Sequence, residues 1–295
     1  MTIRYCHFSL KKRRGFTLTE ILVAVLIMAI VAGSVMMLGY TYFKHFEQAN
    51  EITIAKDRAT MVLTYLERRI LHTGLGMPAS ADEFKDAFAG LLGDLDGWDL
   101  SIYSPENEDS SSTLKIAYAF PSGVYSIESA DIGTTTSAVR ISKTIDVGNF
   151  VFSDSSTKGW VVFPSVTTPL RITAVDNTSG SESVSLQSKT GNWSLPANDE
   201  LFYVRFMEAT VDDGKFKIKE HTLGGGLQPV VEGVIGCNFS LDENKVLKVS
   251  ILARGSKKYS SFVSPASIPG WDGVVDNESR KYYLVVVNKG WRIRN

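Results

Sequence analysis

Glu20 is the residue whose chemistry first needs an explanation, because it is a carboxylate at the start of a long apolar run. No other acidic or basic side chain occurs between Arg14 and Lys44. A carboxylate inside a membrane-spanning helix costs about 2.5–3.5 kcal/mol at the helix centre and less near an end. A plain membrane anchor therefore does not explain why Glu20 is present.

The apolar run after Glu20 is long enough to cross a membrane. Ile21 to Phe43 is a stretch of 23 residues without charge, and a helix needs about 20 to span the hydrocarbon core. The four basic residues at 11–14 predict that the N-terminal side stays cytoplasmic and that everything after residue 44 is exported. A cleaved secretory signal fits less well, because its apolar region is usually about 7–15 residues long and ends at a small-residue cleavage site.

The residues around Gly15 form a more specific pattern. The sequence KKRRGFTLTE at 11–20, which leads directly into the apolar run, resembles the type III signal of prepilins and pseudopilins. The resemblance implies that a prepilin peptidase in the membrane cuts between Gly15 and Phe16, and that the new amino group of Phe16 is methylated. Residues 1–15 would then be a basic leader, recognised through Lys11, Lys12, Arg13 and Arg14.

This resemblance supplies Glu20 with a partner. Cleavage after Gly15 would leave a free amine on Phe16, four residues before Glu20, and residues four apart share one face of a helix. In this family the amine of one subunit is viewed as meeting the glutamate of a neighbour in the filament. Because charges in an apolar setting are costly unless they are paired, Glu20 is predicted to act as a docking register during assembly.

The composition indicates a folded body without internal disulfides. The chain has 295 residues, of which 44% are hydrophobic, and a formal net charge of −1. Residues 1–15 contain five basic residues and no acid, so the rest is mildly acidic and gives no electrostatic reason to expect nucleic-acid binding. Of the two cysteines, Cys6 lies in the leader, which leaves Cys237 alone in the processed chain and predicted to be buried.

Helical periodicity continues beyond the apolar run. Small and apolar residues recur at steps of three or four as far as Ile70, and charged residues occupy the other sides. The pattern predicts one helix over residues 16–72, in which 16–43 lies in the membrane or filament core and 44–72 is amphipathic. Glycine and then proline, up to Pro78, end this helix.

A β-rich periplasmic or extracellular domain is expected at 73–295. It begins with a short helix over 80–92, where Ser80 and Glu83 form a capping-box pair. Period-two patterns then predict strands at 114–120, 138–141, 160–163, 170–175, 183–187, 201–208, 215–219, 230–235, 237–241, 246–253 and 282–287. Loop-rich sequence at 101–200 marks an insertion-rich middle.

The expected fold class is α+β, with a long N-terminal helix packed on a mainly antiparallel β-sheet, and it resembles the pilin fold. Further stretches, ERRILHTGLG at 67–76 and VLKVSILARG at 246–255, resemble PilW-like minor pilins and J-type pseudopilins. A major pilin would be shorter and would usually close a disulfide loop. The chain departs from that pattern, which favours a minor subunit.

The resemblance implies a non-enzymatic minor pilin, held in the inner membrane by a single pass before it joins a type IV pilus at or near the tip and primes assembly. Its partners would be the prepilin peptidase, other minor pilins, the major pilin and the inner-membrane assembly platform. Two alternatives stay open. One is a J-like minor pseudopilin of a type II secretion system, and the other is a tip adhesin whose middle region at 101–200 binds a surface or glycan.

Little in the sequence predicts enzyme or cofactor chemistry. The histidines of the mature chain have no partner at the spacing of a metal or nucleophile motif, and each is expected at the surface or at a helix end: His45, His72 and His221. Three acids surround a turn and form a weak candidate for calcium, without the spaced glutamate of an EF-hand: Asp94, Asp96 and Asp99.

Overall fold

The computed structural model describes residues 16–89, 91, 98, 100–103, 112–146 and 156–293. Its first element is helix α1, which extends from Leu18 to Ile70. The chain divides into two compact units, Met1–Asn50 and Glu51–Asn295. We call the described part of the first unit, residues 16–50, the anchor, and the second unit the body. Helix α1 therefore supplies the whole of the anchor helix and the first element of the body.

The last turns of α1 form the apolar stripe that the sequence predicts. Its buried apolar residues in the body recur at steps of three or four: Ala55, Ala59, Val62, Leu63, Leu66 and Ile70. The helix ends at Ile70, two residues earlier than predicted, and the chain then turns through Gly74 and Gly76, both at positive φ. A Cβ on Gly76 would lie 2.8 Å from the carbonyl oxygen of Phe163, so only glycine fits this close approach.

The second helix, α2, spans Ala81–Ala87 and is shorter than predicted. Its start is as expected, because the Ser80 hydroxyl accepts a hydrogen bond from the Glu83 amide at 3.3 Å. The predicted end at residue 92 was wrong. Phe88 leaves the helical conformation, with ψ at 24°, and its ring packs 5.1 Å from that of Trp160 between centroids. Because the Phe88 ring packs on distant residues of the body, the helix ends at Ala87.

A nine-stranded antiparallel sheet forms the main β-layer of the body. Its strands are β1 (Ile102–Tyr103), β2 (Thr113–Tyr125), β4 (Ser137–Arg140), β5 (Trp160–Phe163), β6 (Val166–Asp176), β7 (Ser183–Ser188), β9 (Glu200–Asp212), β10 (Lys215–Glu220) and β11 (Gln228–Glu232). The main order is β1-β2-β9-β5-β6-β7-β4, and β10 joins both β9 and β11. The two longest strands, β2 and β9, pair along most of their length.

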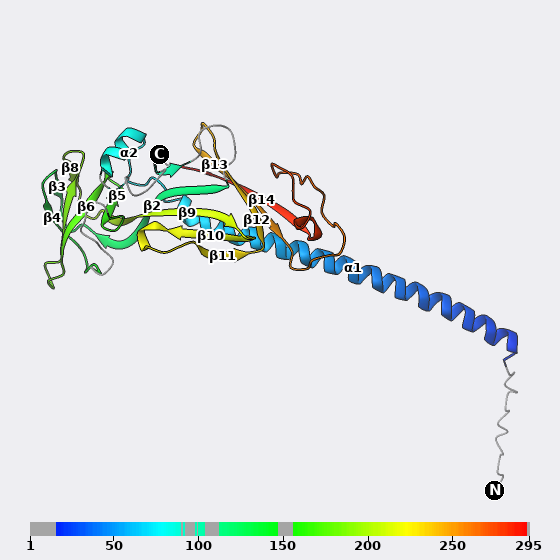
Figure 1. Cartoon of the computed structure of the whole chain (residues 1–295). Helices are drawn as coiled ribbons and strands as arrows, with labels where there is room; N and C mark the ends of the chain where they lie inside the picture. The colour runs from blue at the N-terminus through cyan, green and yellow to red at the C-terminus, as the bar shows by residue number, and fades with distance from the viewer. Residues whose placement is uncertain are drawn as a thin grey trace, which may run out of the picture. The chain divides into compact units, whose positions relative to one another are not determined.

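Two smaller sheets complete the body. Strands β12 (Val234–Leu241), β13 (Val246–Arg254) and β14 (Leu284–Arg292) form an antiparallel sheet with β13 in the centre. Strands β3 (Ala130–Ile132) and β8 (Trp193–Leu195) form the other. Short 3₁₀ turns, η3 (His221–Leu223) and η4 (Ser279–Lys281), precede β11 and β14. Figure 1 shows β3, β4 and β8 at one end of the body, away from β12, β13 and β14. The long helix and mainly antiparallel sheets are the α+β pilin-like arrangement that the sequence predicts.

Gly233 divides a segment that the sequence predicted as one strand. Residues 230–235 were expected to be continuous, but β11 ends at Glu232 in the nine-stranded sheet and β12 begins at Val234 in the three-stranded sheet. Gly233 has φ +78°, and a Cβ there would lie 2.4 Å from Nη1 of Arg58. The chain therefore changes sheets at a residue whose backbone conformation and close contact both require glycine.

Three hydrophobic clusters fill the body. The first joins α1 to β2, β9, β10 and the three-stranded sheet, the second lies among β4, β5, β6 and β7, and the third joins α2 to β2, β5 and β9. Cys237 belongs to the first, as predicted: it is 4% exposed, and its thiol donates to the carbonyl of Ser112 at 3.1 Å. Burial raises the pKa of this thiol to about 12, so it stays protonated near neutral pH.

Glu51 and Arg58 bind the body part of α1 to the segment after β13. Glu51 is 5% exposed, and its carboxylate accepts hydrogen bonds of 2.8 Å from the Ser256 hydroxyl and from the Lys257 amide. Arg58 donates to the carbonyls of Arg254 and Gly255 at 2.7 and 2.9 Å. These bonds satisfy two charged side chains that would otherwise be costly to bury.

Replacing Glu51 with glutamine is expected to lower stability by about 1–3 kcal/mol at pH 7, and less in acid. Burial by itself raises the pKa of Glu51, but hydrogen bonds from Lys257 and Ser256 and the charge of Arg58 outweigh it, so that the pKa lies below its ordinary value of 4.5. The stability contributed by this charge is present above the unfolded pKa and is lost as the pH falls through the folded pKa.

Urea unfolding of the wild type and Glu51→Gln across this pH range measures the effect. The difference in free energy of unfolding between the two proteins should shrink below about pH 4.5. A difference that stays constant in acid would show that the Glu51 charge contributes no stability.

Candidate processing and assembly site

Thr17 and Glu20 close the N-terminal end of α1 through reciprocal hydrogen bonds. The Thr17 amide donates to Oε2 of Glu20 at 2.8 Å, and the Thr17 hydroxyl donates to the same oxygen at 2.9 Å. In return, the Glu20 amide donates to Oγ1 of Thr17 at 3.3 Å. This geometry is a capping box, with Thr17 as the N-cap and Glu20 at the third helical position.

The cap gives Glu20 a local role that the interpretation of the sequence missed. The signal was available, because threonine followed three residues later by glutamate, ahead of an apolar run, is the capping-box pattern. A carboxylate in the first turn also interacts favourably with the partial positive charge of the helix end. Part of the cost of placing this carboxylate at an apolar helix is therefore offset within the helix itself.

The site residues predicted from the sequence are only partly placed by the structure. Phe16 directly precedes the cap, and its side chain is 82% exposed. Glu20 lies one turn further along the helix. It follows the predicted cleavage point and belongs to the residues that the structure describes. Gly15 and the basic residues at 11–14 lie outside the described residues. Cleavage, methylation and docking therefore stay predictions.

From Ile21 to Phe43 the anchor is apolar on all sides. Its large hydrophobic side chains are exposed in the isolated chain, from Ile21 to Phe43, and this part of α1 is long and apolar enough to cross a membrane. A helix that is hydrophobic all round requires lipid or other apolar helices around it. The structure thus has the anchor that a single-pass membrane protein needs.

Two hydroxyl side chains within the anchor are satisfied by the helix backbone itself. The Ser34 hydroxyl donates to the carbonyl of Ile30, and the Thr41 hydroxyl donates to the carbonyl of Met37, both at 2.9 Å. Internal bonds of this kind are required in hydrocarbon, where water does not replace them. The hydroxyl groups of Ser34 and Thr41 therefore have no need of water.

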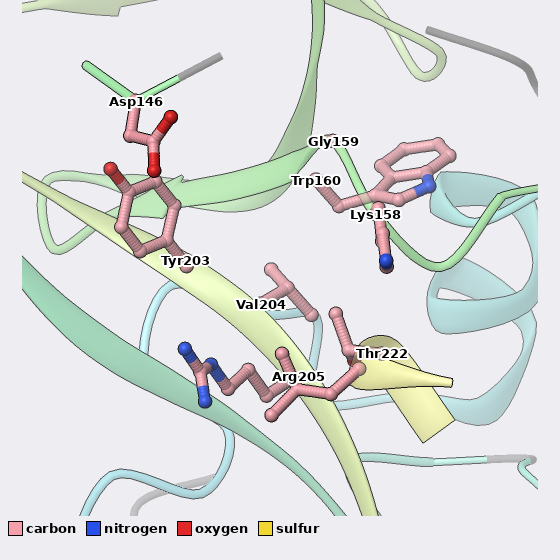
Figure 2. Close-up of a pocket in the computed structure, with 9 residues that line it drawn as sticks. Asp146, Lys158, Gly159, Trp160, Tyr203, Val204, Arg205 and Thr222 are labelled. Carbon is pink, nitrogen blue, oxygen red and sulfur yellow. The ribbon is translucent and has the colours of Figure 1, made fainter. Parts of the chain in front are cut away.

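A hollow of about 120 Å³ lies beside β9 in the body. Figure 2 shows the Asp146 carboxylate next to the phenol of Tyr203, with Lys158 and Trp160 across the hollow. Burial raises the pKa of Tyr203, and the negative charge of Asp146 raises it further. A phenol with a raised pKa stays protonated near neutral pH, so it is a hydrogen-bond donor here and a poor general base.

His221 was expected at the surface or at a helix end, and it is partly buried at the first position of the short 3₁₀ turn η3. Its Nε2 lies 3.3 Å from Oε2 of Glu208, and its ring centroid is 4.9 Å from that of Trp98. Burial lowers the pKa of His221, although the bond to Glu208 opposes this. The lowered pKa favours a neutral imidazole near pH 7.

The calcium candidate lies outside the described residues. The structure does not describe Asp94, Asp96 or Asp99. Within the described ranges, no group of three or more histidine, cysteine, aspartate or glutamate side chains is placed to hold a metal ion. Calcium binding by the three acids thus stays a prediction.

Comparison with protein-family models finds a match at the N-terminus. Residues 10–36 match the prokaryotic N-terminal methylation motif. This range contains the basic residues at 11–14, the Gly15–Phe16 junction, the capping box and the apolar run as far as residue 36. Together with the long apolar helix and the α+β body, the match supports a type IV pilin-like protein with a prepilin signal.

The match also bears on what the protein does. A prepilin motif implies processing by a peptidase and assembly with pilin partners, and it suggests a structural subunit more than an enzyme. It supports a type IV pilin or pseudopilin that is anchored in the membrane before assembly. No curated protein and no solved structure matches the chain significantly.

The full chain is expected to stay in the membrane fraction when membranes are washed with alkaline carbonate, because its apolar helix is long enough to span the bilayer. A variant with arginine in place of both Leu26 and Ile30 should be retained much less, since each charge near the helix centre costs about 2.5–3.5 kcal/mol. Immunoblotting of the washed membranes measures both. Release of the wild type by carbonate would contradict a spanning anchor.

Proposed function

We propose that this protein is a minor pilin that is processed after Gly15 and incorporated at or near the tip of a type IV pilus, where it helps to start assembly. The observation that carries the proposal is the methylation motif at 10–36, which continues into a capped apolar helix and a separate folded body. Such a chain has a segment for the membrane or filament core and a segment for contacts outside it.

Glu20 is the residue proposed to control docking. Both hydrogen bonds from Thr17 end on Oε2, and among the described residues Oε1 accepts none. The capping box uses the Thr17 amide, which remains an amide after cleavage at Gly15. The mature helix can therefore keep its cap while Oε1 accepts the Phe16 amine of a neighbouring subunit, in a pair that apolar surroundings strengthen.

The minor role rests on the size and chemistry of the body. The chain has 295 residues, longer than expected of a major pilin, and Cys237 is a free buried cysteine. The proposed partners are the prepilin peptidase, the other minor pilins, the major pilin and the inner-membrane assembly platform. The basic residues at 11–14 favour a cytoplasmic N-terminus and an exported body.

A J-like minor pseudopilin of a type II secretion system is the alternative, because the stretches at 67–76 and 246–255 resemble J-type pseudopilins as well as PilW-like minor pilins. Both roles need the same processing and the same anchor. Deletion of the gene separates them: loss of pili with normal secretion supports the pilus role, and loss of secretion with normal pili supports the pseudopilin.

Gly15→Ala is expected to abolish processing, because the peptidase needs close access to the backbone at the cut. The wild type and the variant are expressed with and without the prepilin peptidase, and intact mass is measured. The wild type should lose residues 1–15 and gain one methyl group only when the peptidase is present, and Gly15→Ala should keep its full mass. A wild-type chain that remains uncut would contradict the proposal.

Glu20→Gln separates docking from capping. Glutamine at the third helical position can still accept a hydrogen bond from the Thr17 amide, but it has no charge to pair with an amine. The variant should be cleaved normally and should reduce the number of pili to that of the gene deletion. Thr17→Val is the matched control, since it weakens the cap and keeps the charge.

Counting pili by electron microscopy, with cleavage followed by mass, reads out both variants. Normal piliation in Glu20→Gln would show that the carboxylate serves only as a helix cap. Thr17→Val should assemble close to the wild-type level.

A further inference from the structure

We infer that the end of the body formed by β3, β8 and the adjoining part of β6 binds an uncharged saccharide through a face centred on Trp193. Two hollows of about 510 and 310 Å³ adjoin there, and Trp193 lines both of them. We call these two hollows together the Trp193 face. The inference does not depend on the proposed assembly role, which rests on the anchor.

The first hollow presents hydroxyl, amide and carboxyl groups around the indole. Its polar lining comprises Asp131, Thr135, Ser137, Asn192 and Ser194. Most of these side chains are exposed, so their polar groups are accessible to a ligand. Hydroxyl and amide groups both donate and accept hydrogen bonds, and carboxylates accept them. The set is therefore suited to a ligand that carries many hydroxyl groups.

The second hollow continues the same chemistry on the other side of Trp193. Its polar lining comprises Glu83, Asp86, Thr167, Thr168 and Thr190. The indole nitrogen of Trp193 is enclosed and has no hydrogen-bond partner among the described residues. Because this nitrogen has almost no accessible surface, the part of the ring that a ligand in either hollow can contact is its carbon surface.

The frame behind the Trp193 face is held by hydrogen bonds and burial. Trp193 pairs with Ile132 across the two-stranded sheet, and Ile132 is fully buried. The Ser188 amide donates to the Gly133 carbonyl at 2.9 Å, and the Thr168 and Thr190 hydroxyls lie 3.0 Å apart. A face fixed in this way loses little conformational entropy when a ligand binds.

The charge of the lining selects the class of ligand. Among the described residues, neither hollow is lined by lysine, arginine or histidine, and the charged groups present are carboxylates. An anionic ligand would meet repulsion without a counter-charge. An uncharged saccharide supplies hydroxyl groups for the acceptors and C–H faces for the apolar surface of the partly exposed indole.

Gly133 offers a way to disturb this face with little change to the fold. A Cβ at Gly133 would lie 2.7 Å from Oδ1 of Asn192. Asn192 is exposed, so its flexible side chain can move aside. Gly133→Ala therefore displaces the amide of Asn192 from its position at the rim, while the β3–β8 pairing is expected to remain.

The test uses the full chain in detergent micelles and a biosensor with immobilised tetrasaccharides. The probes are neutral tetrasaccharides of glucose, mannose, galactose and N-acetylglucosamine, with polygalacturonate as the acidic comparison. The variants are Asn192→Ala, Trp193→Phe and Gly133→Ala. Trp271→Phe, in the segment beside β12, is the matched control, and thermal unfolding confirms that each variant is folded.

The wild type should bind at least one neutral tetrasaccharide and should not bind polygalacturonate. Each of the three variants should weaken that binding by about tenfold, as expected for the loss of roughly one hydrogen bond, and Trp271→Phe should bind like the wild type. The inference is overturned if no neutral probe binds, if polygalacturonate binds more tightly, or if the folded variants bind as the wild type does. The Asn192→Ala variant should have the wild-type number of pili. A failure of this saccharide-binding inference can therefore be told apart from a failure of the proposed function, which concerns pilus assembly.

Discussion

Helix α1 is apolar on every side from Ile21 to Phe43, and this constraint governs what the rest of the molecule must provide. A helix of this kind is stable in lipid or among other apolar helices, and Ser34 and Thr41 satisfy their hydroxyl groups on the helix backbone. In the body, the same helix is amphipathic, and its buried stripe packs in the first hydrophobic cluster. One element thus passes from an environment without water to a conventional protein core, and each part has the side-chain pattern that its surroundings require.

Much of the fold follows from periodicity. The helix was predicted to within two residues at each end, strand β5 was predicted with the same bounds, and the Ser80 cap was identified. The failures have physical causes. Strands β3 and β8 have three residues each, too short to show alternation. Phe88 ended α2 because its ring packs on distant residues, and Gly233 divided a strand because of its positive φ and the nearby Arg58.

The candidate site was predictable in its residues but not in all of its chemistry. Phe16 and Glu20 stand in a local pattern that needs no tertiary information. The capping role of Glu20 was local as well, yet the same pattern was applied to Ser80 and not to Thr17. The Trp193 face is a different case, because Glu83, Asp131 and Thr167 are far apart in the sequence. Only the pairing of β3 with β8, beside β6 and α2, brings such residues to one end of the body.

The bonds of Glu51 and Arg58 have a mechanical consequence. They join α1 to Arg254, the last residue of β13, and to the three residues after it, and β13 is hydrogen-bonded on both sides in its sheet. A pull on the helix is therefore transmitted to the strand whose removal would break two ladders of hydrogen bonds. In a filament subunit, tension on the helix would reach the body at a strand that is paired with a neighbour on each side.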